Sequence, residues 1–569
     1  MSNTSTTPLS GGRLLVNALL NHGVEQVFCV PGESYLPVLD ALYDSSINTT
    51  VCRQEGGAAM MAEAWGKLTG TPGICLVTRA PGATNATAGL HIALQDSTPM
   101  ILFIGQISTR IREREAFQEV DYRRFLGSAV KWVAEIDDAE RMDEMISRAF
   151  HVATSGRPGP VALALPENAL SQLAVGRPVS AWQQVETHPG VQELEDIATL
   201  LRSCRSPLVI AGGSRWSERA VQEFQSIAEN WQLPVACSFR RQMLFDHTHP
   251  NYAGDIGIGI NPLLRERVQR ADLILMLGGR FSEMPSQDYS LLAVPAPQQQ
   301  LVHVHPGAEE LGRVYRPTIA VHASPDAFVS AFGRESPPEP VAARGQNVAE
   351  AHAAYEQWSG QFPVTPGEVQ MSHVIRCLAG KLDDEAILTN GAGNYASWIH
   401  RFWKFQHHGT QLAPTSGSMG YGLPAAIAAK LCHPGRQVVA FAGDGCYQMT
   451  MQEFGTAVQA GTSIVVLVID NGMYGTIRMH QERHFPGRVS STTLVNPDFA
   501  ALAAAYGAFS ARVTSDAQFE PALELALAAD RPALIHILIS PEAITPTLTL
   551  SQIRHQAENP ASSALTASD

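Results

Sequence analysis

Short apolar runs alternate with amphipathic helical patterns along almost the whole chain. The stretch after Glu55, for example, places Met61, Trp65 and Leu68 on one helical face. Strands that alternate with helices are typical of parallel α/β architecture, in which helices cover both faces of a sheet. Six of the apolar runs are predicted as strands: Ile74–Thr78, Ile101–Ile104, Leu208–Ala211, Leu273–Leu277, Val438–Ala442 and Ile464–Ile469.

Two segments rich in Pro, Gly and polar residues, Gly176–Gly190 and Gly333–Gly345, interrupt this alternation. Such composition is typical of linkers. The linkers divide the chain into three predicted domains, 10–175, 190–333 and 348–548, each a doubly wound, Rossmann-like parallel sheet. The length of 569 residues agrees with this division, because it is too long for one hydrophobic core. The polar tail after Pro560 is predicted to fray.

Composition and charge narrow the class of protein. Hydrophobic residues make up 45% and charged residues 17% of the chain, as in an ordinary globular protein. The net charge of −14 comes without a basic run, which argues against a nucleic-acid partner. The eight cysteines are scattered and include no CxxC pair, which indicates reduced thiols. Met1–Ser10 lacks the apolar core of a signal peptide, and no apolar stretch is long enough to span a bilayer. We therefore expect a cytoplasmic protein with no membrane partner.

The clearest chemical signal lies in the third domain. Two of its predicted strands end in polar turns, Gly443-Asp444-Gly445 and Asp470-Asn471. Open parallel sheets bind ligands at the carboxyl ends of their strands. Asp444 and Asn471 offer the hard oxygen atoms that Mg²⁺ prefers beside phosphate oxygens, and the glycines let the backbone approach a phosphate. Taken alone, the same residues also suit a tight turn and a cap.

The context of these turns adds a resemblance. The segments AGDGCYQMTMQEFGTAVQAG and IVVLVIDNGMYGTIR resemble the thiamine-diphosphate-dependent enzymes of the acetolactate synthase, pyruvate oxidase and benzoylformate decarboxylase superfamily. The similarity runs from about Leu14 to Leu550 and is closest to acetolactate synthase-like proteins. It implies that Asp444, Asn471 and the backbone carbonyl of Met473 bind Mg²⁺. The family's usual Asn-Asn pair reads Asp470-Asn471 here, and the ligand position keeps its Asn.

The resemblance also implies which residues contact the cofactor. Gly391–Tyr395 matches a loop that contacts the diphosphate, and Thr415–Pro424 matches the segment beneath the cofactor. In that second segment, Met419 would wedge between the two rings and the Gly417 carbonyl would accept a hydrogen bond from the aminopyrimidine. Without the resemblance, the first loop fits an ordinary glycine-rich loop equally well. A buried Met such as Met419 ordinarily fills a gap in the core. The predicted cofactor contacts are Asn394, Tyr395, Gly417, Met419, Gly443, Gly445, Cys446 and Met473.

Thiamine chemistry also needs a carboxylic group. It protonates the aminopyrimidine, which in turn removes the proton from thiazolium C2. Glu55 fits, because it lies in CRQEGG just before an apolar helix. Taken alone, Glu55 fits a second role equally well: a carboxylate at a helix N-terminus, where the positive end of the helix dipole stabilises its charge. The block from Cys52 to Ile101 resembles the catalytic-glutamate block of the family almost throughout, which implies the catalytic role.

Further candidate catalytic residues follow from the same resemblance. Phe117-Gln118-Glu119 matches a segment that acetolactate synthases carry near the substrate, so Gln118 is a predicted catalytic residue. Glu33 aligns with a catalytic Asp of pyruvate decarboxylases and is a candidate acid/base, although a strand-end turn carboxylate is the simpler interpretation. His91 and His480 are left as either pocket-lining or structural histidines.

The sequence identifies the substrate less clearly than it identifies the family. The biosynthetic acetohydroxyacid synthases carry an Arg where this chain has Met284, and a Trp where it has His480. The leading hypothesis is acetolactate-synthase-like carboligation, as in the conversion of two pyruvates to 2-acetolactate and CO₂. One alternative is a non-oxidative 2-keto acid decarboxylase of the benzoylformate decarboxylase type, which the segment DNGMYGTIR resembles. The other is a cofactor-binding protein without turnover, against which the intact Glu55, Asp444 and Asn471 argue.

Two further expectations concern partners. FAD in the middle domain is left open, because Gly212–Arg219 carries only a short glycine signal and Met284 replaces an Arg near it. The resemblance implies a homodimer or homotetramer whose active sites are shared between subunits, with a small 2-keto acid as the substrate.

Overall fold

The computed structural model describes residues 7–177 and 179–559. Residues 1–6 and the tail from Pro560 onward, for which fraying is predicted, lie outside these ranges. The chain divides into two compact units. The first runs to His188 and includes the stretches 305–308 and 322–327, and the second contains the other residues.

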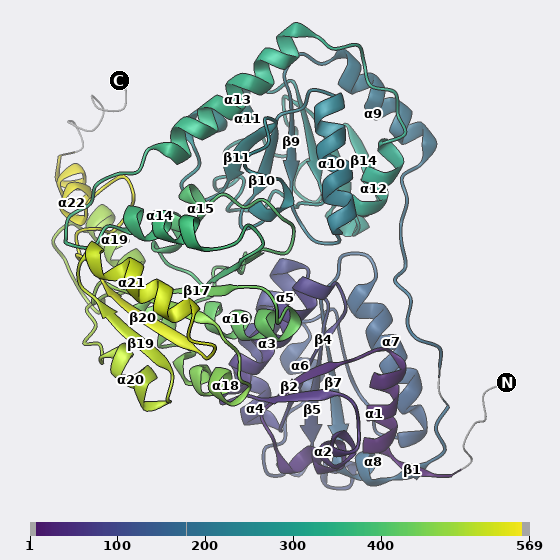
Figure 1. The fold of residues 1–569 in the computed structure, drawn as a ribbon. Helices are drawn as coiled ribbons and strands as arrows, with labels where there is room; N and C mark the ends of the chain where they lie inside the picture. The colour runs from purple at the N-terminus through teal and green to yellow at the C-terminus, as the bar shows by residue number, and fades with distance from the viewer. Residues whose placement is uncertain (1–6, 178, 560–569) are drawn as a thin grey trace. The chain divides into compact units, whose positions relative to one another are not determined.

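The first unit is built on a six-stranded parallel sheet that helices cover (Figure 1). Its central strands are buried along their whole length, which explains why their sequences are continuous apolar runs. Across the sheet the strands are β3 (Asn48–Val51), β2 (Gln26–Cys29), β4 (Gly73–Val77), β5 (Met100–Gln106), β7 (Pro160–Pro166) and β6 (Trp132–Glu135). The helices are α1 (Gly11–Asn21), α2 (Leu36–Tyr43), α3 (Glu55–Thr69), α4 (Ala80–Asn85), α5 (Thr87–Asp96), α6 (Tyr122–Leu126), α7 (Met142–Thr154) and α8 (Glu167–Ser171). A short antiparallel pair joins β1 (Leu9–Ser10) to β8 (Leu173–Ala174).

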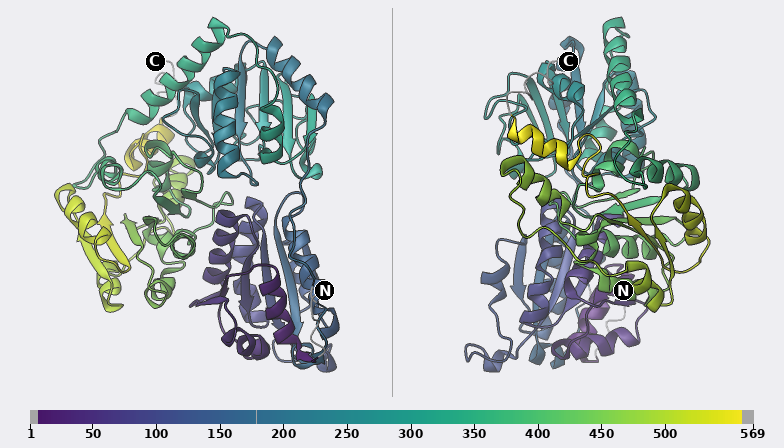
Figure 2. Two further views of the ribbon diagram at one scale, coloured as in Figure 1. Left: turned by 45° about the vertical axis from the view of Figure 1, so that its right-hand side comes forward. Right: turned by 90° about the vertical axis from the view of Figure 1, so that its left-hand side faces the viewer.

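The second unit contains two more six-stranded sheets (Figures 1 and 2). The first of them has the order β11 (Tyr252–Ile256), β10 (Val235–Ser238), β9 (Pro207–Ala211), β12 (Leu273–Leu277), β13 (Gln300–His305) and β14 (Ile319–His322). Its helices are α9 (Val191–Ser203), α10 (Glu218–Asn230), α11 (Pro262–Arg270), α12 (Pro325–Phe332) and α13 (Ala342–Gly360). Helix α13 packs on this sheet, because the ring of Tyr355 meets that of Tyr252 at 4.7 Å and His352 bonds the Tyr252 carbonyl at 3.0 Å.

The other sheet of the second unit carries the candidate site. Its order is β16 (Gln411–Leu412), β15 (Ile387–Asn390), β17 (Val438–Gly443), β18 (Val465–Asp470), β20 (Ala533–Leu538) and β19 (Phe509–Val513), all parallel. The helices are α14 (Met371–Lys381), α15 (Ala396–Phe402), α16 (Gly422–Cys432), α17 (Asp444–Tyr447), α18 (Phe454–Gln459), α19 (Gly475–His484), α20 (Phe499–Ala505), α21 (Asp516–Leu527) and α22 (Leu550–Glu558). In this sheet, β15 is the first strand in sequence order. Strand β16 pairs with it on one side and β17 on the other. The strand order therefore reverses between β15 and β17, the place where open sheets of this type bind ligands.

The predicted fold class is confirmed: three doubly wound α/β domains, each with one parallel sheet. All six predicted strands are strands of these sheets. Among residues 7–177 and 179–559, no helix combines the length and the hydropathy needed to cross a membrane.

Candidate functional site

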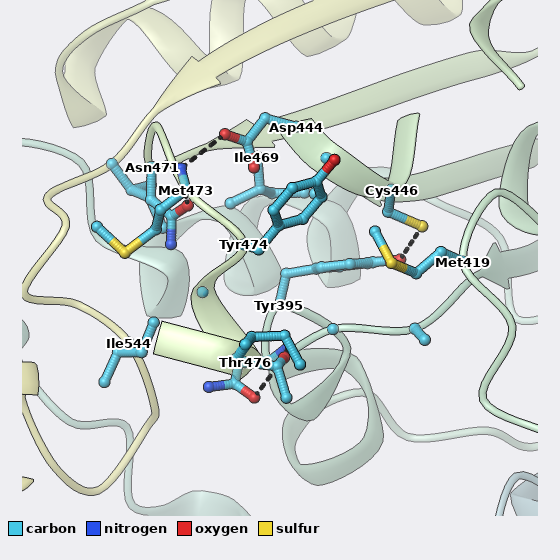
Figure 3. Close-up of a pocket in the computed structure, with 18 of the residues that line it drawn as sticks. Tyr395, Met419, Asp444, Cys446, Ile469, Asn471, Met473, Tyr474, Thr476 and Ile544 are labelled. Atoms are coloured by element: carbon cyan, nitrogen blue, oxygen red, sulfur yellow. Dashed lines mark hydrogen bonds between the residues drawn. The ribbon is translucent and has the colours of Figure 1, made fainter. Parts of the chain in front are cut away.

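A pocket of about 250 Å³ lies where the strand order of the last sheet reverses (Figure 3). Its walls come from the turns after β15, β17 and β18 and from the loop before α16. All the residues predicted in this domain for the cofactor and the metal line this one pocket: Asn394, Tyr395, Gly417, Met419, Gly443, Asp444, Gly445, Cys446, Asn471 and Met473.

The oxygen atoms predicted for a cation meet at one end of the pocket. Asp444 is the first residue of α17 and is only 3% exposed. The backbone N–H of Met473 donates to Oδ2 of Asp444 at 3.2 Å and to Oδ1 of Asn471 at 3.3 Å. One carboxylate and one amide oxygen are thus brought together around a single N–H group. Within the described residues, no group of three or more His, Cys, Asp and Glu side chains could hold a metal ion.

The backbone of Met473 faces the same point. Gly472, with a φ of 69°, turns the chain between Asn471 and Met473. The Gly472 carbonyl and the Tyr474 N–H bond to the segment 492–494, at 2.8 and 2.9 Å. Because bonding groups alternate along an antiparallel pair, the N–H and the carbonyl of Met473 both point away from that segment and toward Asp444. A cation here would meet one carboxylate, one amide and one carbonyl oxygen, a donor set that suits Mg²⁺ with phosphate.

A second carboxylate, Asp470, lies beside Asp444. The pKa of Asp444 is raised overall. Burial is the main cause, the hydrogen bond from the Asn496 amide opposes it, and the negative charge of Asp470 adds to it. Burial also opposes the charge of Asp470, but hydrogen bonds from His536, the Gly472 N–H and Asn496 outweigh burial and lower its pKa. Asp470, whose pKa is lowered, therefore places a negative charge beside Asp444 at the cation end of the pocket.

Sequence reasoning missed two residues of this end, Asn496 and His536. The Asn496 Nδ2 donates to Oδ2 of Asp444 at 2.7 Å and to Oδ1 of Asp470 at 2.8 Å. The His536 Nε2 bonds the other oxygen of Asp470, Oδ2, at 2.9 Å. The Asn-Pro-Asp sequence before α20 indicates only a helix cap, and Asp498 does accept a hydrogen bond from the Ala501 N–H at 3.1 Å.

The loop after β15 is tied to the opposite wall. Oδ1 of Asn394 accepts a hydrogen bond from the Thr476 hydroxyl at 2.9 Å, and the Tyr395 hydroxyl donates to Sγ of Cys446 at 3.2 Å (Figure 3). Burial raises the pKa of the Cys446 thiol, so this side chain is a neutral packing group. At Gly445 an added Cβ would lie 2.6 Å from the ring of Tyr474. Only glycine fits there, and the backbone consequently reaches the pocket.

The end of the pocket away from Asn471 and Met473 is formed by Met419 (Figure 3). Gly417 precedes it with a φ of 68°, in a turn closed by a 3.1 Å hydrogen bond from the Gly417 N–H to the Pro414 carbonyl. The pocket thus has a polar end with the Asp444 carboxylate and the Asn471 amide, and an apolar end with a thioether. A ligand with a charged tail and an apolar ring system suits this polarity.

In the first unit, Glu55 begins α3. Gln54 caps this helix through hydrogen bonds from the N–H groups of Gly56 and Gly57 to its side chain. The Asn85 Nδ2 donates to Oε2 of Glu55 at 2.9 Å, and a Cβ on Gly82 would lie 3.1 Å from Oε1. The backbone of α4 therefore packs against one carboxylate oxygen while Asn85 fixes the other.

Glu33 and Gln118 lie near Arg79, a residue that sequence reasoning missed. Arg79 follows β4 and is 11% exposed at its side chain. Its Nη1 is 4.0 Å from Oε1 of Glu33 and donates to the Phe117 carbonyl at 3.4 Å, and its Nη2 forms an ion pair with Glu167. Gln118 has a φ of 65°, a strained value for a residue that is not glycine. One guanidinium thus contacts residues of the three segments that follow β2, β5 and β7.

The two histidines left open in the sequence do not line the pocket of Figure 3. His91 is exposed on α5, and His480 is exposed on α19, where its ring stacks on that of His484 at 6.2 Å. Met284 is half-buried in the irregular segment after β12.

Comparison with known proteins agrees with this geometry along the chain. The thiamine pyrophosphate enzyme family models match as the N-terminal TPP binding domain at residues 9–125, the central domain at 194–332 and the C-terminal TPP binding domain at 391–537. The chain belongs to the thiamine pyrophosphate enzymes.

Its relatives include subunits of acetolactate synthase. The acetolactate synthase isozyme 2 large subunit of Escherichia coli K12 is 30% identical over 540 residues, which cover 93% of this chain and 96% of that protein. The mitochondrial acetolactate synthase catalytic subunit of Saccharomyces cerevisiae is 29% identical and aligns over 94% of this chain and 81% of its own length. The acetolactate synthase large subunit of Lactococcus lactis subsp. lactis is 29% identical and aligns over 94% and 93%.

Proposed function

We propose that this thiamine pyrophosphate enzyme is an acetolactate-synthase-like carboligase that acts on 2-keto acids with thiamine diphosphate and Mg²⁺. The observation that carries the proposal is the convergence of every predicted contact of the third domain on one pocket. The near full-length similarity to acetolactate synthase subunits supports the same reaction class. A cytoplasmic location is part of the proposal.

The cation end of the pocket would hold Mg²⁺ through Asp444, Asn471 and the Met473 carbonyl. The diphosphate would lie along Gly443, Gly445 and Cys446, with Asn394 and Tyr395 on the opposite wall, and the rings would lie against Gly417 and Met419. When bound, thiamine diphosphate supplies a carbon nucleophile that adds to a keto group and stabilises the electron pair left by departing CO₂. The residues of the chain bind and orient it and exclude water.

The first unit would supply the proton-transfer groups. Glu55 would protonate the aminopyrimidine, and the hydrogen bond from Asn85 orients its carboxyl group for that contact. Gln118 would contact the substrate, and its strained backbone agrees with a functional position. Glu33 is the proposed acid/base of the strand-end cluster around Arg79.

The second candidate function is simple decarboxylation. It is favoured by Met284 and His480, which stand where biosynthetic synthases have the Arg and the Trp that recognise the acceptor keto acid. In that reaction the carbon that loses CO₂ would take up a proton instead of adding to a second carbonyl group. Glu33 would deliver this proton. The two reactions differ in product: carboligation forms a carbon–carbon bond, whereas decarboxylation releases an aldehyde.

We propose a homodimer or homotetramer in which the first unit of one subunit completes the pocket of its partner. Large apolar side chains are exposed near the pocket. Ile477, which lines it, is 56% exposed, and Met449 and Val495 are 47% and 98% exposed. Exposed apolar groups of this size favour a covering partner surface.

Binding of FAD is the open part of the cofactor prediction. The turns Gly212-Gly213 and Gly278-Gly279 follow β9 and β12, where the strand order of their sheet reverses. A Cβ on Gly213 would lie 1.8 Å from the Gly278 carbonyl, so the two turns pack closely on each other. The visible absorbance spectrum of the purified protein decides the question, because bound FAD gives the flavin bands and a flavin-free protein gives none.

The test of the proposed function is product analysis. The purified protein is incubated with pyruvate, thiamine diphosphate and Mg²⁺, and CO₂, acetolactate and acetaldehyde are measured, with a reaction lacking thiamine diphosphate as the control. Acetolactate supports the carboligase, and acetaldehyde alone supports the decarboxylase. Release of no CO₂ from a panel of 2-keto acids would contradict both. A competing 2-ketobutyrate acceptor should show little advantage over pyruvate, because Met284 and His480 replace the Arg and the Trp with which the synthases recognise the acceptor keto acid.

A further inference from the structure

The side chain of Asn496 has only one orientation compatible with its neighbours. Its two amide protons face Oδ2 of Asp444 and Oδ1 of Asp470, at 2.7 and 2.8 Å. Its own oxygen accepts a hydrogen bond from the Gln448 Nε2 at 3.0 Å. Carboxylates can only accept, so a flipped amide would set three oxygen atoms against one another. The donor side of Asn496 is therefore fixed between two negative charges.

Asp470 is fully engaged from its other sides. Its Oδ1 also accepts from the Gly472 N–H at 2.9 Å, and its Oδ2 bonds the Nε2 of His536. His536 is 3% exposed, and the ring of Phe499 packs edge-on against it with the centroids 5.1 Å apart. Asp470 is consequently a fixed anchor, and Asn496 links Asp444 to that anchor.

The same contacts select one oxygen of Asp444 for a cation. Oδ2 receives both the Asn496 amide and the Met473 N–H. A carboxylate whose one oxygen accepts two N–H groups presents its other oxygen, Oδ1, in a set direction. Groups that hold a metal ligand in this way are worth roughly 10- to 100-fold in metal affinity.

We infer that Asn496 is a positioning residue for the proposed Mg²⁺ site: it fastens Asp444 to the Asp470–His536 anchor and directs Oδ1 of Asp444 at the cation. This inference rests on the proposed function, in which Asp444 is a Mg²⁺ ligand. Asn496 itself touches neither the cation nor the substrate.

The test measures metal binding apart from activity. Parent protein and Asn496→Ala are freed of metal with a chelator, supplied with the same excess of thiamine diphosphate and titrated with Mg²⁺ in a calorimeter. We expect Asn496→Ala to raise the half-saturating Mg²⁺ concentration about 10- to 100-fold, while excess Mg²⁺ restores turnover. Asn230→Ala, an exposed Asn at the end of α10, is the matched control and should bind as the parent does.

A second variant covers the case in which Asn496→Ala does not fold. Gln448→Leu leaves Asn496 in place but removes the donor that orients its amide, and we expect a smaller loss of affinity in the same direction. Unchanged Mg²⁺ affinity in a folded Asn496→Ala protein would overturn the positioning role alone. A parent protein that binds neither Mg²⁺ nor thiamine diphosphate would overturn the proposed function as well.

Discussion

Asp444 is the residue on which the proposed metal site depends most. Asp444→Ala removes the one charged candidate ligand that offsets the diphosphate charge, so Mg²⁺-dependent binding of thiamine diphosphate should be lost. Quenching of the intrinsic tryptophan fluorescence by the cofactor is the measurement. Asp383→Ala, an exposed carboxylate of the same domain, is the control. If Asp444→Ala binds the cofactor as tightly as the parent, Asp444 is not a ligand.

The role of Glu55 in activating the cofactor can be tested separately from cofactor binding. Glu55→Gln keeps the shape of the side chain and a hydrogen-bonding partner for Asn85, but an amide cannot supply the proton that the aminopyrimidine needs. We expect the fold and most of the cofactor affinity to remain, while proton exchange at C2 slows by about 10²–10⁴-fold. Hydrogen–deuterium exchange at C2, followed by NMR, measures this rate, and unchanged exchange would exclude Glu55 from activation.

At the scale of single residues, the sequence identified functional residues that lie inside recognisable motifs and did not identify those that lie outside them. Asp444 and Asn471 follow apolar strands in glycine-containing turns, so their neighbours identified them. Asn496 lies 26 positions beyond Asp470, in a loop whose local pattern indicates only a helix cap. Its function comes from the fold, which brings that loop to the ends of β17 and β18. The same applies to Arg79, which meets Glu33 and Glu167 only at the edge of the folded sheet.

Among the secondary-structure elements, the strands were the easiest to predict. Leu273–Leu277 has the predicted bounds because a strand buried on both faces is a continuous apolar run. Helix limits were less predictable. The second predicted linker overlaps α13, which begins at Ala342, because Ala-rich sequence forms a helix directly after the prolines.

The element that carries Glu55 is stabilised by a buried ion group. Lys67 of α3 pairs with Glu63, at 3.1 Å, and with Asp96 of α5, and both carboxylate side chains are 0% exposed. Lys67→Met leaves two buried negative charges without their cation, which should lower the free energy of unfolding by about 3–5 kcal/mol. Arg141→Met breaks the exposed pair between Arg141, the residue before α7, and Glu144 of α7, and should cost far less, because water screens exposed charges. Denaturant unfolding of the two variants compares them, and equal losses would contradict a stabilising role for the buried group.

At the scale of the whole molecule, Glu55 belongs to one compact unit and Asp444 to the other, yet both would contact a single cofactor. Under the proposed shared site, the first unit of one subunit faces the pocket of its partner, and a closed two-fold pair holds two equivalent sites. Under this proposal, Glu55→Gln and Asp444→Ala chains should each be inactive as homodimers. In a heterodimer, one site keeps both residues and the other loses both, so co-expression of differently tagged chains should restore up to about half of the parent activity per dimer. Tandem purification on the two tags isolates that heterodimer, and each variant co-expressed with a tagged copy of itself is the control. A verified heterodimer without activity would mean that each site is built within one chain.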